Sequence, residues 1–275
     1  MKIGVFDSGF GGLSVFKAIK KTLPAYDYVY LGDSARAPYG NYSHEVIYRY
    51  VVEAVEYLFK EQECNLVILA CNTASAQALR RLQQEWLPAS PYADRRVLGV
   101  IRPIAEFIAA GEQGIGVGKK VGVIGTRATI EAGVYKKEIE KQAGKKIKVL
   151  EKACPLLVPM IEEGFHKRPE MKRILRYYLR PLKSAGVQVL INGCTHYELL
   201  HESIKAIMGK RVILLESPQI VADSLQKYLL RHPEIETKLS QTGGIKFLTT
   251  GNVQRFNELG GKFWGAGLKA ERVSL

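Results

Sequence analysis

The chain has 275 residues, of which 47% are hydrophobic, and a formal net charge of +13; this length suffices for two modest domains or one large one. The first residues pass directly into a strand pattern, and no apolar run reaches the roughly 20 residues that span a bilayer, so we expect a cytoplasmic protein without a signal peptide. Four widely spaced cysteines fit reduced thiols better than a disulfide framework, and their spacings to histidine complete no zinc site, so no metal is expected.

The first part of the chain alternates strands and helices. Strands are predicted at 2–6, 28–31, 66–70 and 97–101, and helices at 13–23, 43–61, 72–86 and 104–110. The turn from Asp7 to Gly12 is rich in glycine but lacks the third glycine of a dinucleotide-binding fingerprint. We therefore interpret it as a tight turn or a small-anion site at the end of the first strand.

The pattern starts again at Lys120. The heptapeptide from Lys120 matches the one from Lys2 in residue type, 118 residues later, and Cys194 lies 123 residues after Cys71. Strands at 147–150 and 187–192 and helices at 129–143, 155–163 and 169–185 follow. This near-constant offset indicates an internal duplication.

The remainder contains strands at 212–215 and 245–249 and helices at 220–230 and from 253. It is too small for a third domain, so we expect it to pack on the first half. The sequence thus predicts two pseudo-symmetric, doubly wound α/β domains with mainly parallel sheets and an active site in the cleft between them. The first domain would comprise residues 1–96 and 210–275, and the second residues 97–209.

The positive charge is concentrated in the middle of the chain, where residues 119–183 contain 17 Lys and Arg against 7 Asp and Glu. Such a segment could bind nucleic acid, or it could form solvated helix faces whose field attracts acidic metabolites. No helix-turn-helix, zinc-finger or aromatic RNA-binding signature accompanies it. The sequence favours solvated faces and at most weak, non-specific binding of nucleic acid.

Each half contains a buried-strand pattern that ends near a cysteine, Cys71 or Cys194, and gives way to a helix. Ligands bind at the carboxyl ends of the strands in open α/β sheets, and a helix N-terminus favours the thiolate. One such cysteine could be an inert small hydrophobe, but two in matching positions indicate a reaction that needs two thiols. Two thiols that flank one acidic carbon can remove a proton from one face and return one to the other, which is racemisation or epimerisation.

Each cysteine has a candidate helper nearby in the predicted fold. Asp7 ends the first strand, beside the strand of Cys71, and His196 lies two residues after Cys194. Asp7 could instead be a helix N-cap, and His196 a histidine with a single structural hydrogen bond.

Five ordered motifs resemble those of bacterial glutamate racemases, in the cofactor-independent aspartate/glutamate racemase superfamily, and the likeness covers nearly the whole chain. They are Asp7-Ser8-Gly9, Ala37-Pro38-Tyr39-Gly40, Ala70-Cys71-Asn72-Thr73-Ala74, Ala153-Cys154-Pro155 and Gly193-Cys194-Thr195-His196-Tyr197. The resemblance implies that Cys71 and Cys194 are the catalytic acid and base on opposite faces of Cα, that Asp7 and His196 tune them, and that no cofactor is needed. It also implies an amino-acid site formed by Ser8, Pro38, Tyr39, Gly40, Asn72, Thr73, Thr195 and Glu162, and production of D-glutamate for the peptidoglycan of the cell wall.

Three positions depart from the usual family pattern: Glu198 where proline is common, Arg102 where an acidic residue is frequent, and Glu216 where Asp is frequent. Aspartate or another acidic amino acid is an alternative substrate, because one methylene changes selectivity by only about 1–3 kcal/mol. An amino-acid-binding sensor without turnover is a second alternative. Glutamate is the expected small-molecule partner, a homodimer is left open, and membrane association is not expected.

Overall fold

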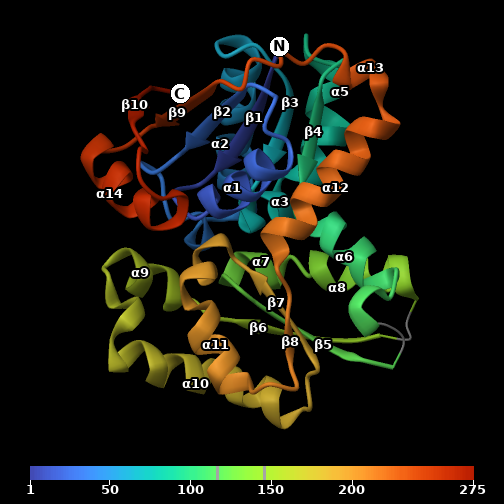
Figure 1. The fold of residues 1–275 in the computed structure, drawn as a ribbon, viewed down its shortest axis with the longest axis vertical. Helices are drawn as coiled ribbons and strands as arrows, with labels where there is room; N and C mark the ends of the chain where they lie inside the picture. The colour runs from blue at the N-terminus through green and yellow to red at the C-terminus, as the bar shows by residue number, and fades with distance from the viewer. Residues whose placement is uncertain (116–117, 145–146) are drawn as a thin grey trace.

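The computed structural model describes residues 1–115, 118–144 and 147–275, and it consists of two α/β lobes, one above the other in Figure 1. We call the lobe that contains the six-stranded sheet the first lobe and the lobe that contains the four-stranded sheet the second. The strand orders are β10-β9-β2-β1-β3-β4 and β6-β5-β7-β8, and every pairing among the described residues is parallel. The predicted fold class of two α/β units with parallel sheets is confirmed.

The strands are β1 (Lys2–Asp7), β2 (Tyr28–Gly32), β3 (Cys64–Leu69), β4 (Arg96–Gly99), β5 (Lys120–Gly125), β6 (Lys148–Ala153), β7 (Val189–Gly193), β8 (Ile213–Leu214), β9 (Ile245–Thr249) and β10 (Ala270–Arg272). The helices are α1 (Leu13–Thr22), α2 (His44–Lys60), α3 (Asn72–Gln77), α4 (Leu79–Arg81), α5 (Leu87–Ala89), α6 (Ile101–Ala109), α7 (Arg127–Glu131), α8 (Val134–Ala143), α9 (Leu157–Glu162), α10 (Pro169–Ser184), α11 (His201–Met208), α12 (Ser217–Arg231), α13 (Pro233–Glu236) and α14 (Val253–Trp264). Short turns of other helix types are η1 (Tyr39–Asn41), η2 (Leu82–Trp86), η3 (Glu112–Gly114), η4 (Phe165–Lys167) and η5 (Thr195–Leu200). Among the described residues, no helix combines the length and the apolarity needed to cross a bilayer.

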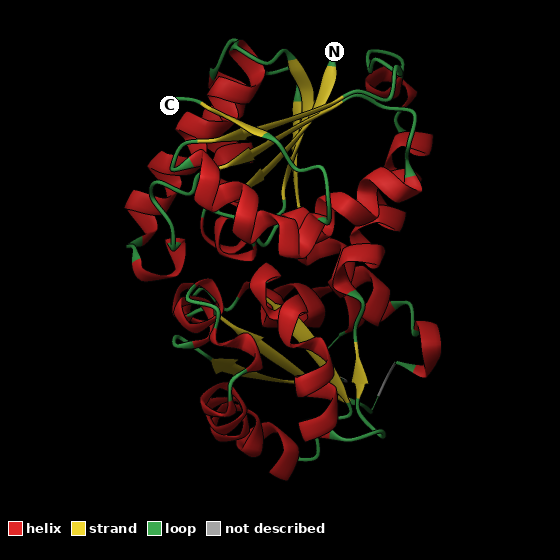
Figure 2. Cartoon of the chain, turned by 60° about the vertical axis from the view of Figure 1, so that its left-hand side comes forward, coloured by secondary structure: helices red, strands yellow, loops and turns green. Residues whose placement is uncertain are grey.

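Each sheet has a hydrophobic core on both faces because neighbouring residues of a strand point to opposite sides. In β1, Ile3 and Val5 pack with α1, α12 and α14, whereas Phe6 packs on the opposite face with α2 and α3. Figure 2 shows helices on both sides of the strands. The buried apolar runs seen in the sequence are therefore central strands of a doubly wound sheet.

The second sheet is covered in the same way. Val121 and Val123 of β5 pack with α6 and α8, and Ile124 packs on the other face with α9, α10 and α11. On α10, Leu175 and Leu179 are buried, while its basic residues are exposed: Lys172, Arg173, Arg176, Arg180 and Lys183. Part of the basic charge in the middle of the chain therefore lies on a solvated helix face.

The internal duplication is visible in the strand order. The arrangement β2-β1-β3-β4 of the first lobe is repeated as β6-β5-β7-β8 in the second, and β9 and β10 extend only the first sheet. Cys71 follows β3 and Cys194 follows β7, so the two cysteines occupy corresponding places in the two repeats.

The predicted domain boundaries do not coincide with the changes of sheet. β4 continues to Gly99, and β8 pairs with β7 in the second sheet, although 212–215 was expected to pack on the first half. The reason is the internal duplication, because β8 pairs with β7 in the second sheet as β4 pairs with β3 in the first. We propose that the lobes divide at 99–101 and 214–217, after which α12 returns to pack against α1.

Two predicted helices are interrupted. The helix expected at 129–143 is divided into α7 and α8 by Gly133, which has a φ of 60°, a left-handed conformation that favours glycine. The helix expected at 72–86 is divided into α3, α4 and the wider turn η2. Helix α6 begins at Ile101, where the sequence predicted the end of a strand.

Candidate active site

Cys71 and Cys194 both lie just past the carboxyl end of a central strand. They are 5% and 6% exposed. Cys71 is the N-cap of α3, and its Sγ accepts a hydrogen bond from the backbone N–H of Ala74 at 3.4 Å. Cys194 occupies the corresponding position before η5, a 3₁₀ turn, but its sulfur accepts no hydrogen bond from the backbone of that turn. The local strand–Cys–helix arrangement expected from the sequence is therefore present in both repeats.

The sulfur of Cys71 lies beside hydroxyl and carboxyl groups of the first lobe. Its Sγ is 3.4 Å from Ser8 Oγ. Asp7 is fully buried, and its Oδ2 accepts a hydrogen bond from the N–H of Gly9 at 2.9 Å. Burial, and then the charge of Asp7, raise the pKa of Cys71 to about 12, and burial also raises the pKa of Asp7. Cys71 is thus a protonated thiol at neutral pH, suited to donate a proton.

The sulfur of Cys194 lies beside an imidazole instead. Its Sγ is 4.0 Å from Nδ1 of His196, whose Nε2 is 3.1 Å from Oε1 of Glu162 at the end of α9. Burial lowers the pKa of His196, but the contacts with Cys194 and Glu162 outweigh it and raise that pKa to about 10. The two sulfurs therefore face groups of opposite character, a carboxyl at Cys71 and an imidazolium at Cys194.

The residue after each cysteine is hydrogen-bonded to the opposite lobe. After Cys71, Asn72 Oδ1 accepts a hydrogen bond from the hydroxyl of Tyr135 on α8 at 2.5 Å. After Cys194, Thr195 donates to Asp7 Oδ1 at 3.4 Å. These reciprocal contacts bring the surroundings of the two cysteines to one place between the lobes.

A cluster of threonines joins the lobes next to these contacts. Thr73 Oγ1 lies 3.0 Å from that of Thr126 and 3.1 Å from that of Thr129. Thr126 is the N-cap of α7 directly after β5. Sequence reasoning missed Thr126, Thr129 and Tyr135, but Thr126 stands 118 residues after Ser8, so the repeat alone could have identified it.

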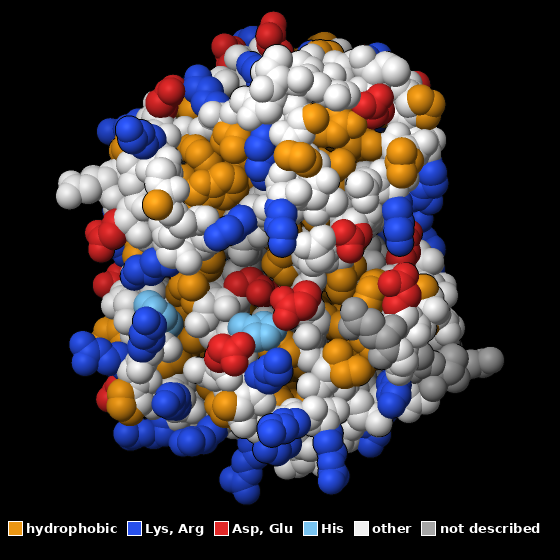
Figure 3. All heavy atoms as spheres, in the orientation of Figure 1, with side chains coloured by type: hydrophobic (Ala, Val, Ile, Leu, Met, Phe, Trp, Pro, Cys, Tyr) orange, Lys and Arg blue, Asp and Glu red, His pale blue; other side chains and the backbone are white. Residues whose placement is uncertain are grey.

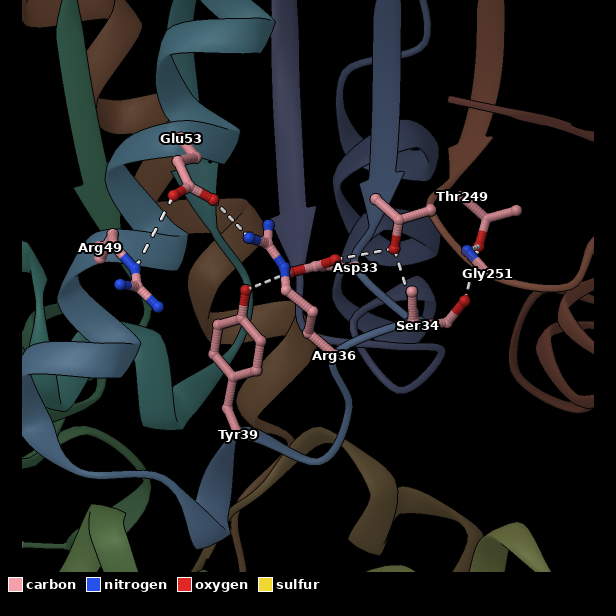
Figure 4. A network of polar contacts seen from close by, with 10 residues as sticks. Asp33, Ser34, Arg36, Tyr39, Arg49, Glu53, Thr249 and Gly251 are labelled. Atoms are coloured by element: carbon pink, nitrogen blue, oxygen red, sulfur yellow. Dashed lines mark hydrogen bonds and ion pairs between the residues drawn. The ribbon is translucent and has the colours of Figure 1, made fainter. Parts of the chain in front are cut away.

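The loop that contains Pro38, Tyr39 and Gly40 is fixed by the polar network of Figure 4. Asp33 accepts hydrogen bonds from Arg36 Nε at 2.6 Å and from the hydroxyl of Tyr39, and Arg36 also pairs with Glu53. The side chain of Tyr39 is buried, and its hydroxyl points to Asp33.

The same loop touches the second lobe through Gly40. A Cβ on Gly40 would lie 2.8 Å from Cβ of Thr126, so only glycine fits there. Pro38 precedes η1 with an extended backbone. The loop therefore borders the space between the lobes through its backbone.

Gly11, in the turn after β1, lies close to Thr195 and His196 of the second lobe. A Cβ on Gly11 would lie 2.8 Å from the backbone N of His196. We expect Gly11→Ala to lower kcat/KM at least about 10-fold, because Thr195 and His196 must move and small misplacements at a reacting centre are costly. Steady-state kinetics measure this.

The matched control is Gly261→Ala on α14, where an added Cβ meets nothing within 4 Å. It should leave the kinetics unchanged and raise the free energy of unfolding by up to about 1 kcal/mol through helix propensity. Equal kinetics for Gly11→Ala and the control would show that close approach at Gly11 is not needed.

The fold and the site define a class: a duplicated, two-lobed α/β protein with one thiol at corresponding places in each repeat. Comparison with known proteins agrees with this class. Residues 3–223 match the family described as Asp/Glu/Hydantoin racemase. The chain belongs to this family.

The similar proteins carry a common name. A glutamate racemase of a Sulfurihydrogenibium species is 38% identical over 275 residues, which cover 100% of this chain and 98% of that protein. Among solved structures, a glutamate racemase of Bacillus anthracis is 34% identical with a TM-score of 0.87, covering 100% of this chain and 97% of the other. A glutamate racemase of Francisella tularensis, solved in complex with D-glutamate, is 32% identical with a TM-score of 0.86, covering 99% and 97%.

Proposed function

We propose that this protein interconverts L- and D-glutamate by proton transfer between Cα of the substrate and the two thiols of Cys71 and Cys194. The observation that supports this best is the placing of the cysteines at matching positions of the two repeats, with the residue after each one bonded to the opposite lobe. The names of the relatives support glutamate over aspartate as the substrate. The D-glutamate formed is expected to serve as a precursor of peptidoglycan.

The reaction consists of two proton transfers. The thiolate of one cysteine takes the proton from Cα, which leaves a carbanion stabilised by the adjacent carboxyl group. The thiol of the other cysteine then donates its proton to the opposite face of Cα and becomes the thiolate. The proton balance is closed, the thiols have exchanged roles, and no redox change occurs, so this sequence of steps requires no cofactor.

The surroundings of the thiols suit this exchange. Cys71 is protonated in the resting protein because it is buried beside Asp7. The Cys194 sulfur has a proton-exchanging partner in His196, which is itself held by Glu162. We propose that Cys194 is the base and Cys71 the acid for the enantiomer whose Cα–H faces Cys194. For the opposite enantiomer the roles are exchanged, once Cys194 has the proton and Cys71 is the thiolate.

The remaining predicted residues would hold the substrate around Cα. We propose that Ser8, Asn72, Thr73 and Thr195 contact it through hydroxyl, amide and backbone N–H groups, and that Pro38, Tyr39 and Gly40 do so through the backbone. The hydroxyl of Tyr39 is bonded to Asp33, and Glu162 is bonded to His196. Glu162 is therefore better described as a positioning residue for His196 than as a substrate ligand.

Racemisation of L-glutamate in heavy water tests the two-thiol mechanism. If one thiol removes the proton and the other delivers a solvent deuteron, the first D-glutamate formed is α-deuterated while the remaining L-glutamate stays protonated. Nuclear magnetic resonance and loss of circular dichroism measure both. Early deuterium in the recovered substrate would instead indicate a single base, and binding without any exchange would indicate a sensor. L-Aspartate, run in parallel, should react much more slowly.

Three further proposals concern the location of the protein, its oligomeric state and its binding of nucleic acid. The protein is proposed to act in the cytoplasm, where its thiols stay reduced. Assembly into a homodimer is checked by light scattering. Nucleic acid should bind only weakly and lose affinity steeply with salt, since the exposed lysines and arginines of α10 offer charge without base recognition.

A further inference from the structure

Three side chains gather where the chain leaves the second lobe and enters α12. They are Glu198 in η5, His201 at the start of α11 and Glu216 just before α12. One ligand atom of each lies within 4.8 Å of the other two, and Nε2 of His201 is 3.5 Å from Oε1 of Glu216. Figure 3 shows acidic side chains gathered beside a histidine near the middle of this face, on a protein whose net charge is +13.

A small cavity between the candidate active site and this cluster is lined by Asn72 and Thr195 on one side and by Glu198 on the other, and two of its polar atoms have no partner among the described residues. Its volume is about 10 Å³, the space of one water molecule. Glu198, Asn192 and Ser217 line it, and the amide of Asn192 donates to Glu198 Oε1 at 3.3 Å. Asn192 Oδ1 and Ser217 Oγ accept and donate no hydrogen bond among the described residues, although Asn192 is only 2% and Ser217 only 7% exposed. Buried polar atoms of this kind indicate a missing partner.

Among the residues that the structure describes, neither carboxylate pairs with a lysine or an arginine. Glu216 forms an ion pair with His201, and Glu198 forms none. The nearest polar partner of Glu198 is the amide of Asn192. Because ligand atoms of the two carboxylates lie within 4.8 Å of each other, a cation at this place would offset their repulsion.

We propose that Glu198, His201 and Glu216 bind one divalent transition-metal ion, Zn²⁺ or Mn²⁺, whose coordinated water occupies the cavity and bonds to Asn192 Oδ1 and Ser217 Oγ. An imidazole nitrogen with two carboxylates suits these ions. Ca²⁺ and Mg²⁺ prefer oxygen ligands alone. Because α12 packs on α1, an ion held by Glu216, Glu198 and His201 would tie the start of α12 to the second lobe.

The test uses the full-length protein, stripped with a chelator and dialysed. Isothermal titration with MnCl₂ and with ZnCl₂ should show one site for at least one ion. Glu216→Gln and His201→Gln should each raise its Kd at least about 10-fold. Glu202→Gln, an exposed neighbour outside the cluster, should leave it unchanged. Circular dichroism checks that each variant is folded, which is expected because the side chain of Glu216 is 68% exposed.

Cobalt absorption separates this site from the cysteines. Co²⁺ bound by imidazole and carboxylates gives only weak visible bands, whereas Co²⁺ on the thiolate of Cys194 adds an intense charge-transfer band. We expect the weak bands alone at one equivalent, lost in His201→Gln. The absence of binding by all three ions, an affinity that Glu216→Gln does not alter, or a thiolate band at the first equivalent would each overturn the proposal.

Discussion

Serine in place of either Cys71 or Cys194 is expected to lower kcat for glutamate racemisation by at least about 10³-fold in both directions. Each direction needs one thiolate to accept a proton and one thiol to donate one, and general acid–base catalysis is worth about 10²–10⁴-fold. A serine hydroxyl has nearly the size of the thiol but ionises far less readily, so it supplies neither step. Circular dichroism at saturating L- and D-glutamate measures both rates.

Cys64→Ala is the matched control. Cys64 is a buried thiol at the opposite end of β3 from Cys71, and burial raises its pKa to about 12 as well. Its removal should cost stability, because it leaves a small cavity in the core, but kcat should stay within about 2-fold. If Cys71→Ser or Cys194→Ser kept more than a tenth of the wild-type kcat, the two-thiol mechanism would be wrong.

Asp7→Asn should lower kcat by about 10²-fold while it raises the free energy of unfolding by about 1–3 kcal/mol at neutral pH. The amide oxygen can still accept the hydrogen bond from Gly9, and the amide N–H can donate to the hydroxyl of Thr195 in place of the present bond from Thr195. The geometry is therefore preserved and the charge beside Cys71 is lost. Activity falls because the group that exchanges protons with the Cys71 site is gone. Stability rises because a buried carboxylate no longer has to be desolvated.

The stability gain should depend on pH in a defined direction. The pKa of Asp7 is raised by folding above its ordinary value of 3.8. A raised pKa gives a stabilising contribution that is complete below the unfolded value and is lost as the pH rises through the folded one. The difference in unfolding free energy between Asp7→Asn and wild type should therefore grow as the pH rises from about 4. Urea denaturation at a series of pH values measures it.

Asp27→Asn is the control with the opposite sign. Asp27 is buried, but hydrogen bonds from Thr242 and Gly244 outweigh the burial and lower its pKa to about 2. A lowered pKa stabilises the fold above the unfolded value, so Asn should destabilise the protein at neutral pH without changing kcat. An Asp7→Asn protein less stable than wild type at pH 7 would contradict the assignment of Asp7 as a costly buried charge.

Features carried by short segments could be predicted from the sequence. The apolar runs before Cys71 and Cys194 predicted central strands, because a strand buried on both faces is apolar throughout. The heptapeptides at Lys2 and Lys120 predicted the duplication, because each is a short segment that can be compared with the other. The place of β8 in the second sheet could not be predicted, because this strand has only two residues and its role shows only in its pairing with β7.

Contacts between the lobes were not readable in this way. The bond from Tyr135 to Asn72 and the cluster of Thr73, Thr126 and Thr129 join residues more than 50 positions apart, and no local pattern specifies such pairs. The orientation of Tyr39 is another example. Its hydroxyl is bonded to Asp33, and the choice between that partner and a substrate depends on the three-dimensional path of the loop.

The two thiols lie at corresponding places of the two repeats but in different surroundings, and thermodynamics limits what this difference can do to the rates. Enantiomers have equal free energy in water, so the ratio kcat/KM must be the same for L- and D-glutamate whatever the enzyme does. The fold offers the two hands nearly equivalent halves, yet a carboxyl stands beside Cys71 and an imidazolium beside Cys194. Any difference that this asymmetry creates between the two turnover numbers must therefore reappear, in equal proportion, as a difference between the two Michaelis constants.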